Sequence, residues 1–428
     1  MKRRSFLAGL GAGALAGSLA GCSSGFSRDG EHDRSTLRMT MWTSDPDQLA
    51  LFEKIASEFI ATNATVTDIK FESLTLDQLD MVLTSGITAD NAPDLSWLPV
   101  ESSLEYIQAG ALLDVTPALT TTNGYDYDDL VPRLQKPWRV GDAQYGVPFS
   151  TGPLIMYFNQ DLYDKAGVRS PAQLLADDDW TWESFRTTSK ELKDAAGVPG
   201  YVVNDFEFRN WTRLLPLLYA YGASPWSADA TRCTVDSPEM NAALSVFNTM
   251  VFDDHSSPVP GQQVDFWGGQ AGATSAFLGS SILLESADFD WGVVPTPRGP
   301  AGDGQALGQS AIVALTAGKN HEAALEFLAY LTKAENARRI SSFFPPARNS
   351  LLSPEVLAES SGILTEQQLG PMVESIRKRA QIFPVAPNAA RVANALDSAL
   401  DEFVYAPDVD LDQALPKVCH AIEPVLSQ

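Results

Sequence analysis

The stretch Leu37–Phe59, LRMTMWTSDPDQLALFEKIASEF, predicts a strand, a turn and a helix in direct succession. Residues 37–43 alternate between the two faces of a strand and favour β structure. Ser44-Asp45-Pro46 then supplies a capping side chain and a proline suited to the first turn of a helix. The apolar residues that follow recur at helical spacing: Leu49, Phe52, Ala56 and Phe59. The stretch is therefore one βα unit.

Further βα units follow along the chain. Alternating strands and helices predict an α/β fold in which mainly parallel sheets are flanked by helices, and two such lobes fit 428 residues. Open sheets of this kind bind ligands beyond the carboxyl ends of their strands, so the loops after Thr43 and Leu98 are the first candidates for a binding site. Strands are predicted at 68–74, 94–98, 154–159, 201–204 and 312–315, and helices at 76–84, 104–109, 182–195, 211–221, 241–252 and 322–331.

The composition is that of a folded, acidic protein. Hydrophobic residues make up 44% and charged residues 20% of the chain, which is the range of soluble globular proteins. The net charge is −24, and an acidic surface repels phosphate backbones, so a nucleic-acid binder is excluded. The 3 cysteines and 4 histidines are too scattered for a zinc framework. We expect neither a metal site nor a cofactor.

The N-terminus predicts export and a lipid anchor. Residues 1–21 join a basic head, Lys2-Arg3-Arg4, to an uncharged run shorter than the roughly 20 residues of a membrane-spanning helix, as an export signal does. Arg3-Arg4 followed by Ser-Phe-Leu resembles the twin-arginine motif, and Leu19-Ala20-Gly21-Cys22 resembles a bacterial lipobox. Cleavage before Cys22 and its acylation, for example with palmitate, would hold the protein at the outer face of the bacterial cell membrane. Residues 22–35 are polar and lack periodicity, which predicts a flexible tether.

Eight short blocks along the body carry a resemblance to a known family. They occur in the order seen in extracellular solute-binding proteins, and the chain resembles the sugar-binding branch of that family, which contains maltose-binding protein. Each block alone is short, and it is their common order behind a lipoprotein signal that is specific. The blocks are APDLSWL (92–98), YGVPF (145–149), LIMYFNQDLY (154–163), WESF (182–185), WGVVP (291–295), GQS (308–310), AALEFL (323–328) and PARNS (346–350).

The resemblance implies a two-lobed periplasmic-binding-protein fold whose lobes close on a ligand in the cleft between them. It places lobe one at 36–150 and 309–346, and lobe two at 151–308 and 347–428. It also implies a function. A substrate-binding lipoprotein of an ATP-binding-cassette importer captures a di- or oligosaccharide and delivers it to transmembrane permease subunits.

Two other functions stay open. Relatives of this kind carry glycerophosphodiesters or glycerol 3-phosphate, and Arg348 is suited to their phosphate. A secreted glycoside hydrolase needs only paired carboxylates, for which Glu101 and Glu285 are candidates. Nothing in the spacing holds these two side chains together, and the chain lacks the Walker A, zinc-protease and nucleophile-elbow motifs. Binding is therefore favoured over catalysis.

Ligand-binding candidates in the first lobe lie at strand ends, where polar groups could bond sugar hydroxyls. Glu101 follows the 94–98 strand, where family members place an acidic ligand contact. Trp42 ends the first strand, where core packing is favoured over ligand contact, and Asp45 opens the next helix, where capping is favoured. Thr151 and Gly152 lie at the first crossover between the lobes, in the expected cleft wall.

The second lobe supplies the other candidates. Trp267 lies between Phe266 and two glycines, and ligand contact and packing are both open for its ring. Glu285 stands where the family commonly carries an aromatic segment. Arg348 matches an arginine that related receptors aim into the cleft, where its planar fork holds vicinal hydroxyls or an anion. The loop after the 201–204 strand is rich in aromatics, of which one or two rings are expected in the cleft: Asn204, Phe206, Phe208 and Trp211.

Cys233 and Cys419 are the cysteines that remain once Cys22 is acylated. The exported compartment permits oxidation, and the resemblance places both in lobe two. A disulfide between them is predicted, with two separate buried thiols as the alternative.

Overall fold

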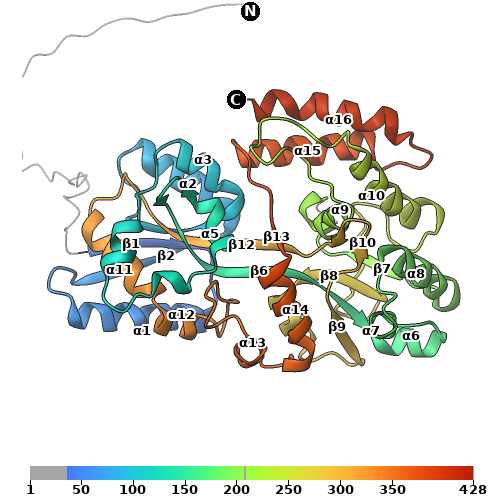
Figure 1. The fold of residues 1–428 in the computed structure, drawn as a ribbon, viewed down its shortest axis with the longest axis horizontal. Coiled ribbons are helices and arrows are strands. Elements are labelled where there is room, and N and C mark those ends of the chain that lie inside the picture. Colours follow the sequence, from blue (N-terminus) through green and yellow to red (C-terminus); the bar gives the residue numbers. More distant parts are fainter. Residues whose placement is uncertain (1–35, 207–208, 428) are drawn as a thin grey trace, which may run out of the picture. The chain divides into compact units, whose positions relative to one another are not determined.

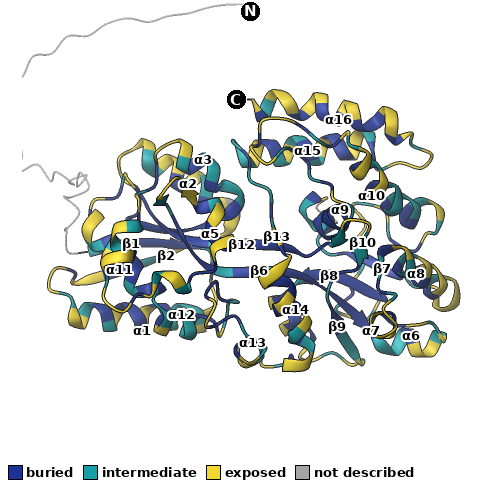
Figure 2. Cartoon of the chain, in the orientation of Figure 1, coloured by how far each residue is buried: buried dark blue, intermediate teal, exposed yellow. Residues whose placement is uncertain are grey.

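The computed structural model describes residues 36–206 and 209–427. The expected export signal, the tether and Cys22 lie outside these residues, and so does Phe208. A 9-stranded sheet forms the centre of the described chain, in the order β2-β1-β3-β12-β6-β8-β7, with β13 pairing with β12 and β9 with β6 (Figure 1). Figure 2 shows its strands buried, while the helices around them expose their outer faces.

The first lobe is built around three parallel strands. β1 (Thr36–Met41) pairs in parallel with both β2 (Asp68–Ser73) and β3 (Leu95–Pro99). Its helices and its small hairpin are α1 (Pro46–Thr62), α2 (Leu76–Thr88), α3 (Ser103–Gln108), α4 (Thr116–Thr121), α5 (Pro132–Gln135), α11 (His321–Thr332), α12 (Ala334–Ile340), β4 (Arg139–Val140) and β5 (Ala143–Gln144).

α1 begins and packs as its sequence predicts. The Asp45 carboxylate accepts hydrogen bonds from the backbone N–H groups of Asp47 and Gln48, and Pro46 occupies the first turn, where its missing N–H costs nothing. The apolar face is buried against the sheet and α11: Phe52, Ile55, Ala56 and Phe59.

Two long strands connect the lobes. β6 (Val147–Asn159) and β12 (Ala306–Ala314) run antiparallel through the centre of the sheet. The end of β12, Ser310–Ala314, pairs with β3 in the first lobe, and the end of β6, Leu154–Asn159, pairs with strands of the second. The backbone of Thr151 in β6 also bonds to Pro345, where the chain passes between the lobes once more.

The second lobe is built around β8 (Ala273–Phe277), which pairs in parallel with β7 (Tyr201–Val203) and antiparallel with β6. Its remaining strands are β9 (Trp291–Val294), β10 (Arg298–Gly299), β11 (Gly302–Asp303) and β13 (Gln381–Ile382). Its helices are α6 (Gln160–Ala166), α7 (Pro171–Ala176), α8 (Trp182–Ala196), α9 (Leu215–Ala220), α10 (Pro238–Asn248), α13 (Pro354–Ser361), α14 (Glu366–Lys378), α15 (Ala389–Phe403) and α16 (Leu411–Leu426).

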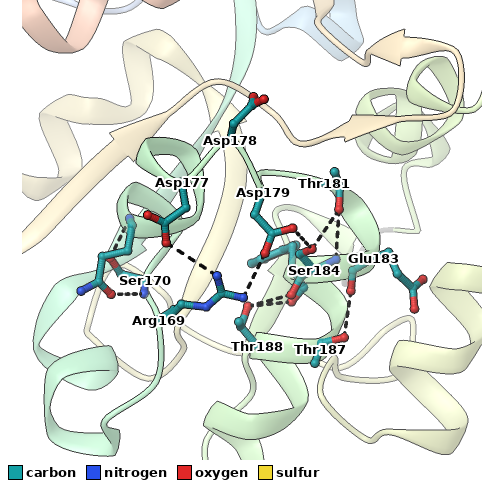
Figure 3. Close-up of polar contacts among 12 residues, drawn as sticks. Arg169, Ser170, Asp177, Asp178, Asp179, Thr181, Glu183, Ser184, Thr187 and Thr188 are labelled. Carbon is teal, nitrogen blue, oxygen red and sulfur yellow. Dashed lines mark hydrogen bonds and ion pairs between the residues drawn. The ribbon is translucent and has the colours of Figure 1, made fainter.

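The start of α8 shows how this lobe anchors its helices (Figure 3). The Thr181 hydroxyl accepts the backbone N–H of Ser184 at 3.1 Å and so caps the helix. The Ser184 hydroxyl donates to Asp179 at 2.7 Å, and Arg169 pairs with the same carboxylate at 3.0 Å. These hydrogen bonds, from Ser184 first and then Arg169, lower the pKa of Asp179. The acidic run before α8 is thus held by local partners.

The α/β prediction is confirmed, and the structure adds detail to it. Parallel pairs occur within each lobe, and antiparallel pairs occur where β6 and β12 cross between them. The helix expected at 211–221 is instead a 3-10 turn, Trp211–Leu214, followed by α9, in which Pro216 lies in the first turn. A proline there lacks the N–H that would continue one α-helix from Trp211.

The predicted bridge between Cys233 and Cys419 is present in the structure, with a Cα–Cα distance of 5.4 Å. It ties the segment before α10 to α16, and both cysteines are buried.

Candidate functional site

The strand ends of the two lobes face each other over the middle of β6 and β12. β3 ends at Pro99, opposite Ser310, and β8 ends at Phe277, opposite Leu154. β3 and β8 run in opposite directions along this sheet, because each is related to the other through β12 and β6 by three antiparallel pairings. Their carboxyl ends therefore point toward the same short stretch of the crossover strands, which is where open α/β sheets bind ligands.

Two glycines form the floor of this stretch. Gly152 of β6 pairs directly with Gly308 of β12, and the Phe277 ring packs on both. A Cβ at Gly152 would lie 3.0 Å from Phe277 Cδ1, and one at Gly308 would lie 2.9 Å from Cε1. Glycine is required at both positions because any side chain would displace the ring. Gly152 thus belongs to the floor rather than supplying a polar group.

Arg213 covers the ring from elsewhere in the second lobe. Its guanidinium carbon lies 4.6 Å from the centroid of Phe277, which is cation–π geometry. Its Nη2 pairs with Asp205 Oδ2 at 2.6 Å, and the side chain is 12% exposed. Among the described residues no group accepts a hydrogen bond from its buried Nε–H. The Nε–H of this arginine is therefore a buried donor available to a ligand.

Glu101 approaches this arginine from the first lobe. It lies in the 3-10 turn Val100–Ser102 that follows β3, as the sequence predicts. Burial raises the pKa of its carboxyl, while the charge of Arg213 acts in the opposite direction. Burial also raises the pKa of Tyr219 in α9, and the charge of Glu101 adds to that shift. The structure therefore brings Glu101 together with Arg213 and Tyr219 across the two lobes.

Gln309 follows the glycine pair on β12 and is buried. Its Oε1 accepts the indole N–H of Trp138 at 2.7 Å, whereas its Nε2 has no hydrogen-bond partner among the described residues. A buried amide with an unused donor is costly unless another group, such as a ligand oxygen, accepts it. The amide is a second unused donor beside the floor.

A cavity of about 370 Å³ lies beside the segment that follows this strand end. Leu278, which follows Phe277 directly, lines it together with Ser281 and Ile282 of the second lobe. The first lobe contributes Asp45, Asp47 and Gln48 from the start of α1. The capping interpretation of Asp45 is confirmed, and its carboxylate also borders this cavity.

Trp42, Thr151 and Asn204 lie close to the strand ends but are not free groups of the cluster. Trp42 is half-buried and packs edge-on against Trp97, with ring centroids 5.3 Å apart, as the core interpretation predicts. The Thr151 hydroxyl donates to the carbonyl of Pro345, so it joins two crossings of the chain instead of lining a cleft wall. Asn204 directly follows β7, half-buried, next to Asp205.

The expectation for Arg348 is corrected by the structure. The side chain is 2% exposed and pairs with Asp129 at 3.2 Å. Its remaining donors reach backbone carbonyls of the first lobe: those of Thr332, Asp126 and Tyr125. Every part of the guanidinium is used to hold the chain after Pro346 against the first lobe, so none is left to hold a ligand.

Three aromatic expectations and Glu285 are corrected in the same way. Phe206 is buried against Phe247 and Tyr405, and Trp211 against Trp226. Trp267 packs on Tyr157 and Phe266 at the edge of the second lobe's core. These rings pack on other aromatic side chains of the second lobe's cores. Glu285 is exposed in a separate open depression with Gln160 and Trp291.

Sequence reasoning missed Arg213, Asp205, Phe277 and Gln309. Asp205 and Arg213 belong to the loop after β7 that the sequence singled out for its aromatics. Asp205 has a φ of 57°, a left-handed conformation that Asp and Asn tolerate better than most residues. The contact to Phe277 could not be read from spacing, because the two residues lie on separate segments.

Among residues 36–206 and 209–427, no group of His, Cys, Asp and Glu side chains has the geometry of a metal site. In the same part of the chain, no helix combines the length and the apolar character needed to cross a bilayer.

The chain is similar to known proteins along most of its length. It is 23% identical over 404 residues to a binding protein of Brucella abortus (strain 2308), covering 90% of this chain and 93% of that protein. It is 25% identical over 329 residues to a lipoprotein of Streptomyces antibioticus, covering 72% and 68%. It is 21% identical over 315 residues to the arabinooligosaccharide-binding protein of Bacillus subtilis, covering 69% and 70%.

Solved structures share the fold. The ABC substrate-binding protein Lmo0181 of Listeria monocytogenes, in complex with cycloalternan, matches with a TM-score of 0.76 at 21% identity, covering 91% of this chain and 98% of that one. UgpB of Mycobacterium tuberculosis, in complex with glycerophosphocholine, matches with a TM-score of 0.71 at 19% identity, covering 90% and 98%.

A family match extends from the end of β1 through α12 and includes both crossover strands. Residues 43–338 match the family described as bacterial extracellular solute-binding protein. Its members and the neighbours above are binding proteins and not enzymes, which removes the glycoside hydrolase alternative. The chain belongs to the family of bacterial extracellular solute-binding proteins.

Proposed function

We propose that this protein is the substrate-binding lipoprotein of an ATP-binding-cassette importer, capturing a di- or oligosaccharide between its lobes and delivering it to membrane permease subunits. The observation that carries the proposal is the cluster at the facing strand ends, where Arg213 lies over Phe277 and within reach of the charge of Glu101. Charged and amide groups of this kind bond sugar hydroxyls from both sides. Because the two lobes share the cluster, a ligand there would favour their closed arrangement.

The proposal includes the expected position of the protein in the cell. Export under residues 1–21 and acylation of Cys22 would leave residues 22–35 as a tether at the outer face of the membrane. The lipobox-like sequence supports this, as does the similarity to a Streptomyces lipoprotein. The lobes are proposed at 36–150 with 309–346, and at 151–308 with 347–428.

A receptor for glycerophosphodiesters or glycerol 3-phosphate is the second candidate. It is supported by the structural likeness to UgpB in complex with glycerophosphocholine. The burial of Arg348 removes the cation that the sequence suggested for the phosphate. Arg213 is then the cation of the site, and it is already paired with the Asp205 carboxylate.

Calorimetric titration of the purified protein with maltose, lactose, an arabino-oligosaccharide and glycerophosphocholine tests the proposal. For a sugar that binds, Arg213→Ala is expected to weaken affinity at least about tenfold, because a charge-assisted hydrogen bond contributes about 1.5–3 kcal/mol. Arg213→Lys keeps the charge but loses the planar fork, so its sugar affinity should lie between that of wild type and that of Arg213→Ala. Arg169→Ala, which removes a surface ion pair near α8, is the control and should bind like wild type.

The proposal is contradicted if no carbohydrate binds, or if Arg213→Ala binds as tightly as the control. Melting curves of each variant separate loss of affinity from loss of fold. The anchor is tested separately by mass spectrometry of protein taken from membranes, where a diacylated Cys22 is expected as the first residue. An intact Met1 or an unmodified Cys22 thiol would contradict that part.

A further inference from the structure

We propose that Asp205 sets the charge selectivity of the site: by pairing with Arg213 it makes the site reject phosphate-bearing and other anionic ligands and accept uncharged carbohydrates. The inference rests on the proposed function, since it concerns the ligand class of the same cluster. It gives Asp205 a role in specificity, whereas the sequence suggested Arg348 as the residue that decides whether an anion binds.

The geometry of Arg213 carries the argument. An arginine that binds phosphate uses a free pair of parallel N–H donors in a bidentate contact. Here Nη2 is committed to Asp205 at 2.6 Å, and the guanidinium lies on the Phe277 ring. The buried donor without a partner among the described residues is Nε–H. A single hydroxyl oxygen can accept from Nε–H without disturbing the ion pair, whereas a bidentate phosphate would compete with the Asp205 carboxylate for the same guanidinium.

The surrounding charges act in the same direction. Glu101 from the first lobe lies near enough for its charge to interact with that of Arg213. Two carboxyl groups therefore accompany one guanidinium, so a phosphate would meet no excess of positive charge in the cluster. The cavity lined by Leu278, the residue after Phe277, is bordered by Asp45 and Asp47, and no lysine or arginine is among the described residues that line it.

The backbone at Asp205 makes the charge testable without changing the fold. Its φ of 57° lies in the left-handed region, where Asn is tolerated as well as Asp because a short polar side chain bonds locally. Asp205→Asn therefore removes the carboxylate charge and keeps a similar side chain. Asp401→Asn is the matched control, because Asp401 pairs with Arg209 at 2.7 Å on the surface and its loss changes the net charge of the protein equally.

The experiment measures binding of sn-glycerol 3-phosphate and of inorganic phosphate by calorimetry, beside a neutral sugar panel. Wild type and Asp401→Asn are expected to bind both phosphate probes more weakly than a Kd of about 1 mM. Asp205→Asn should gain at least about tenfold in affinity for them, and the double variant Glu101→Gln, Asp205→Asn should gain more. The gained affinity should fall as salt is added, because salt screens the attraction between the guanidinium and the phosphate.

The outcomes separate this inference from the proposed function. Phosphate binding by wild type at micromolar concentration overturns it, as does an Asp205→Asn variant that folds and gains no more than Asp401→Asn. If neutral sugars bind wild type in that second case, the proposed function stands without it. If Asp205→Asn gains phosphate affinity while no neutral sugar binds wild type, the selectivity role is supported and the proposed function fails.

Discussion

Two arginines of the same chemistry differ in how their hydrogen-bond donors are used. Arg348 donates hydrogen bonds to the carbonyls of Thr332, Asp126 and Tyr125 and pairs with the buried carboxylate of Asp129. Arg213 keeps a buried donor without a partner among the described residues. A satisfied buried ion stabilises the fold, whereas an unsatisfied donor is stabilised only when a ligand arrives. Residue type alone does not distinguish these cases.

Arg348→Ala is accordingly expected to reduce stability rather than affinity. It leaves the Asp129 carboxylate and three backbone carbonyls in the interior without their donor, and breaking a buried pair in this way costs about 3–5 kcal/mol. Urea unfolding measures the loss. Arg338→Ala, at a surface pair with Glu359, is the control and should cost less than about 1 kcal/mol. If Arg348→Ala unfolds in urea like the control but binds sugar more weakly, Arg348 belongs to the binding site.

Asp397 on α15 predicts a pH dependence of stability. Burial raises the pKa of its carboxyl to about 6, although the backbone N–H of Trp211 donates to it. The folded protein then holds this proton more tightly than the unfolded chain. The unfolding free energy should therefore increase as the pH falls from about 6 toward about 4, and this contribution is lost as the pH rises through 6.

Asp397→Asn should remove this dependence and keep the acceptor for Trp211. At pH 7.5 the variant is expected to be more stable by about 1 kcal/mol, a value reduced from the full shift because the side chain is partly exposed. Thermal melts at pH 5 and 7.5 measure it, with Asp401→Asn as the control for net charge. Parallel pH profiles of wild type and Asp397→Asn would assign the dependence to other carboxyls.

Among the helices and strands, sequence patterns predicted the features that depend on neighbouring residues. The capping side chain of Asp45, the proline after it and the helical spacing that follows placed α1 correctly, because a helix start depends on a few adjacent residues. β6 begins seven residues before the predicted 154–159 strand, at Val147. Pro148, Gly152 and Pro153 are residue types that weaken a strand prediction, but pairing with β12 holds them extended. That partner lies far away in sequence.

The proposed binding cluster was only half predictable for the same reason. The sequence suggested Glu101 and Gly152 of this cluster, since one follows a strand end and the other lies at a crossover. The ring that covers the floor and the arginine above it come from β8 and the 3-10 turn before α9, and neither has a local signal. Tertiary contacts determine these positions.

The pairing of β6 and β12 predicts that Gly308 tolerates no side chain. In Gly308→Val a Cβ would lie 2.9 Å from Phe277, so the ring and the guanidinium above it must shift. Sugar affinity should fall at least about tenfold, while overpacking costs about 1–3 kcal/mol of stability. Gly370→Ala on α14, where a Cβ meets nothing within 4 Å, is the control. Unchanged affinity in a folded Gly308→Val would move the site away from this floor.

For the whole molecule, the bridge between Cys233 and Cys419 constrains the unfolded chain most. The two residues are 186 positions apart, so the bridge closes a loop that includes most of the second lobe's strands and α10 to α15. Fewer unfolded conformations are accessible to a chain closed over so long a loop, and the larger the loop, the larger the stabilisation. The bridge joins no residue of the binding cluster, so its effect should be on unfolding.

The variant in which both cysteines become serine is therefore expected to lose about 2–5 kcal/mol in unfolding free energy and to keep its sugar affinity below its melting temperature. Reduction of the wild type with a thiol reagent before the melt should lower its melting temperature to near that of the variant, and should not change the variant. Titration of free thiols in the denatured, unreduced protein is an independent test of the bridge. Two free thiols there, or equal melting temperatures with and without reductant, would mean that the native protein carries no bridge.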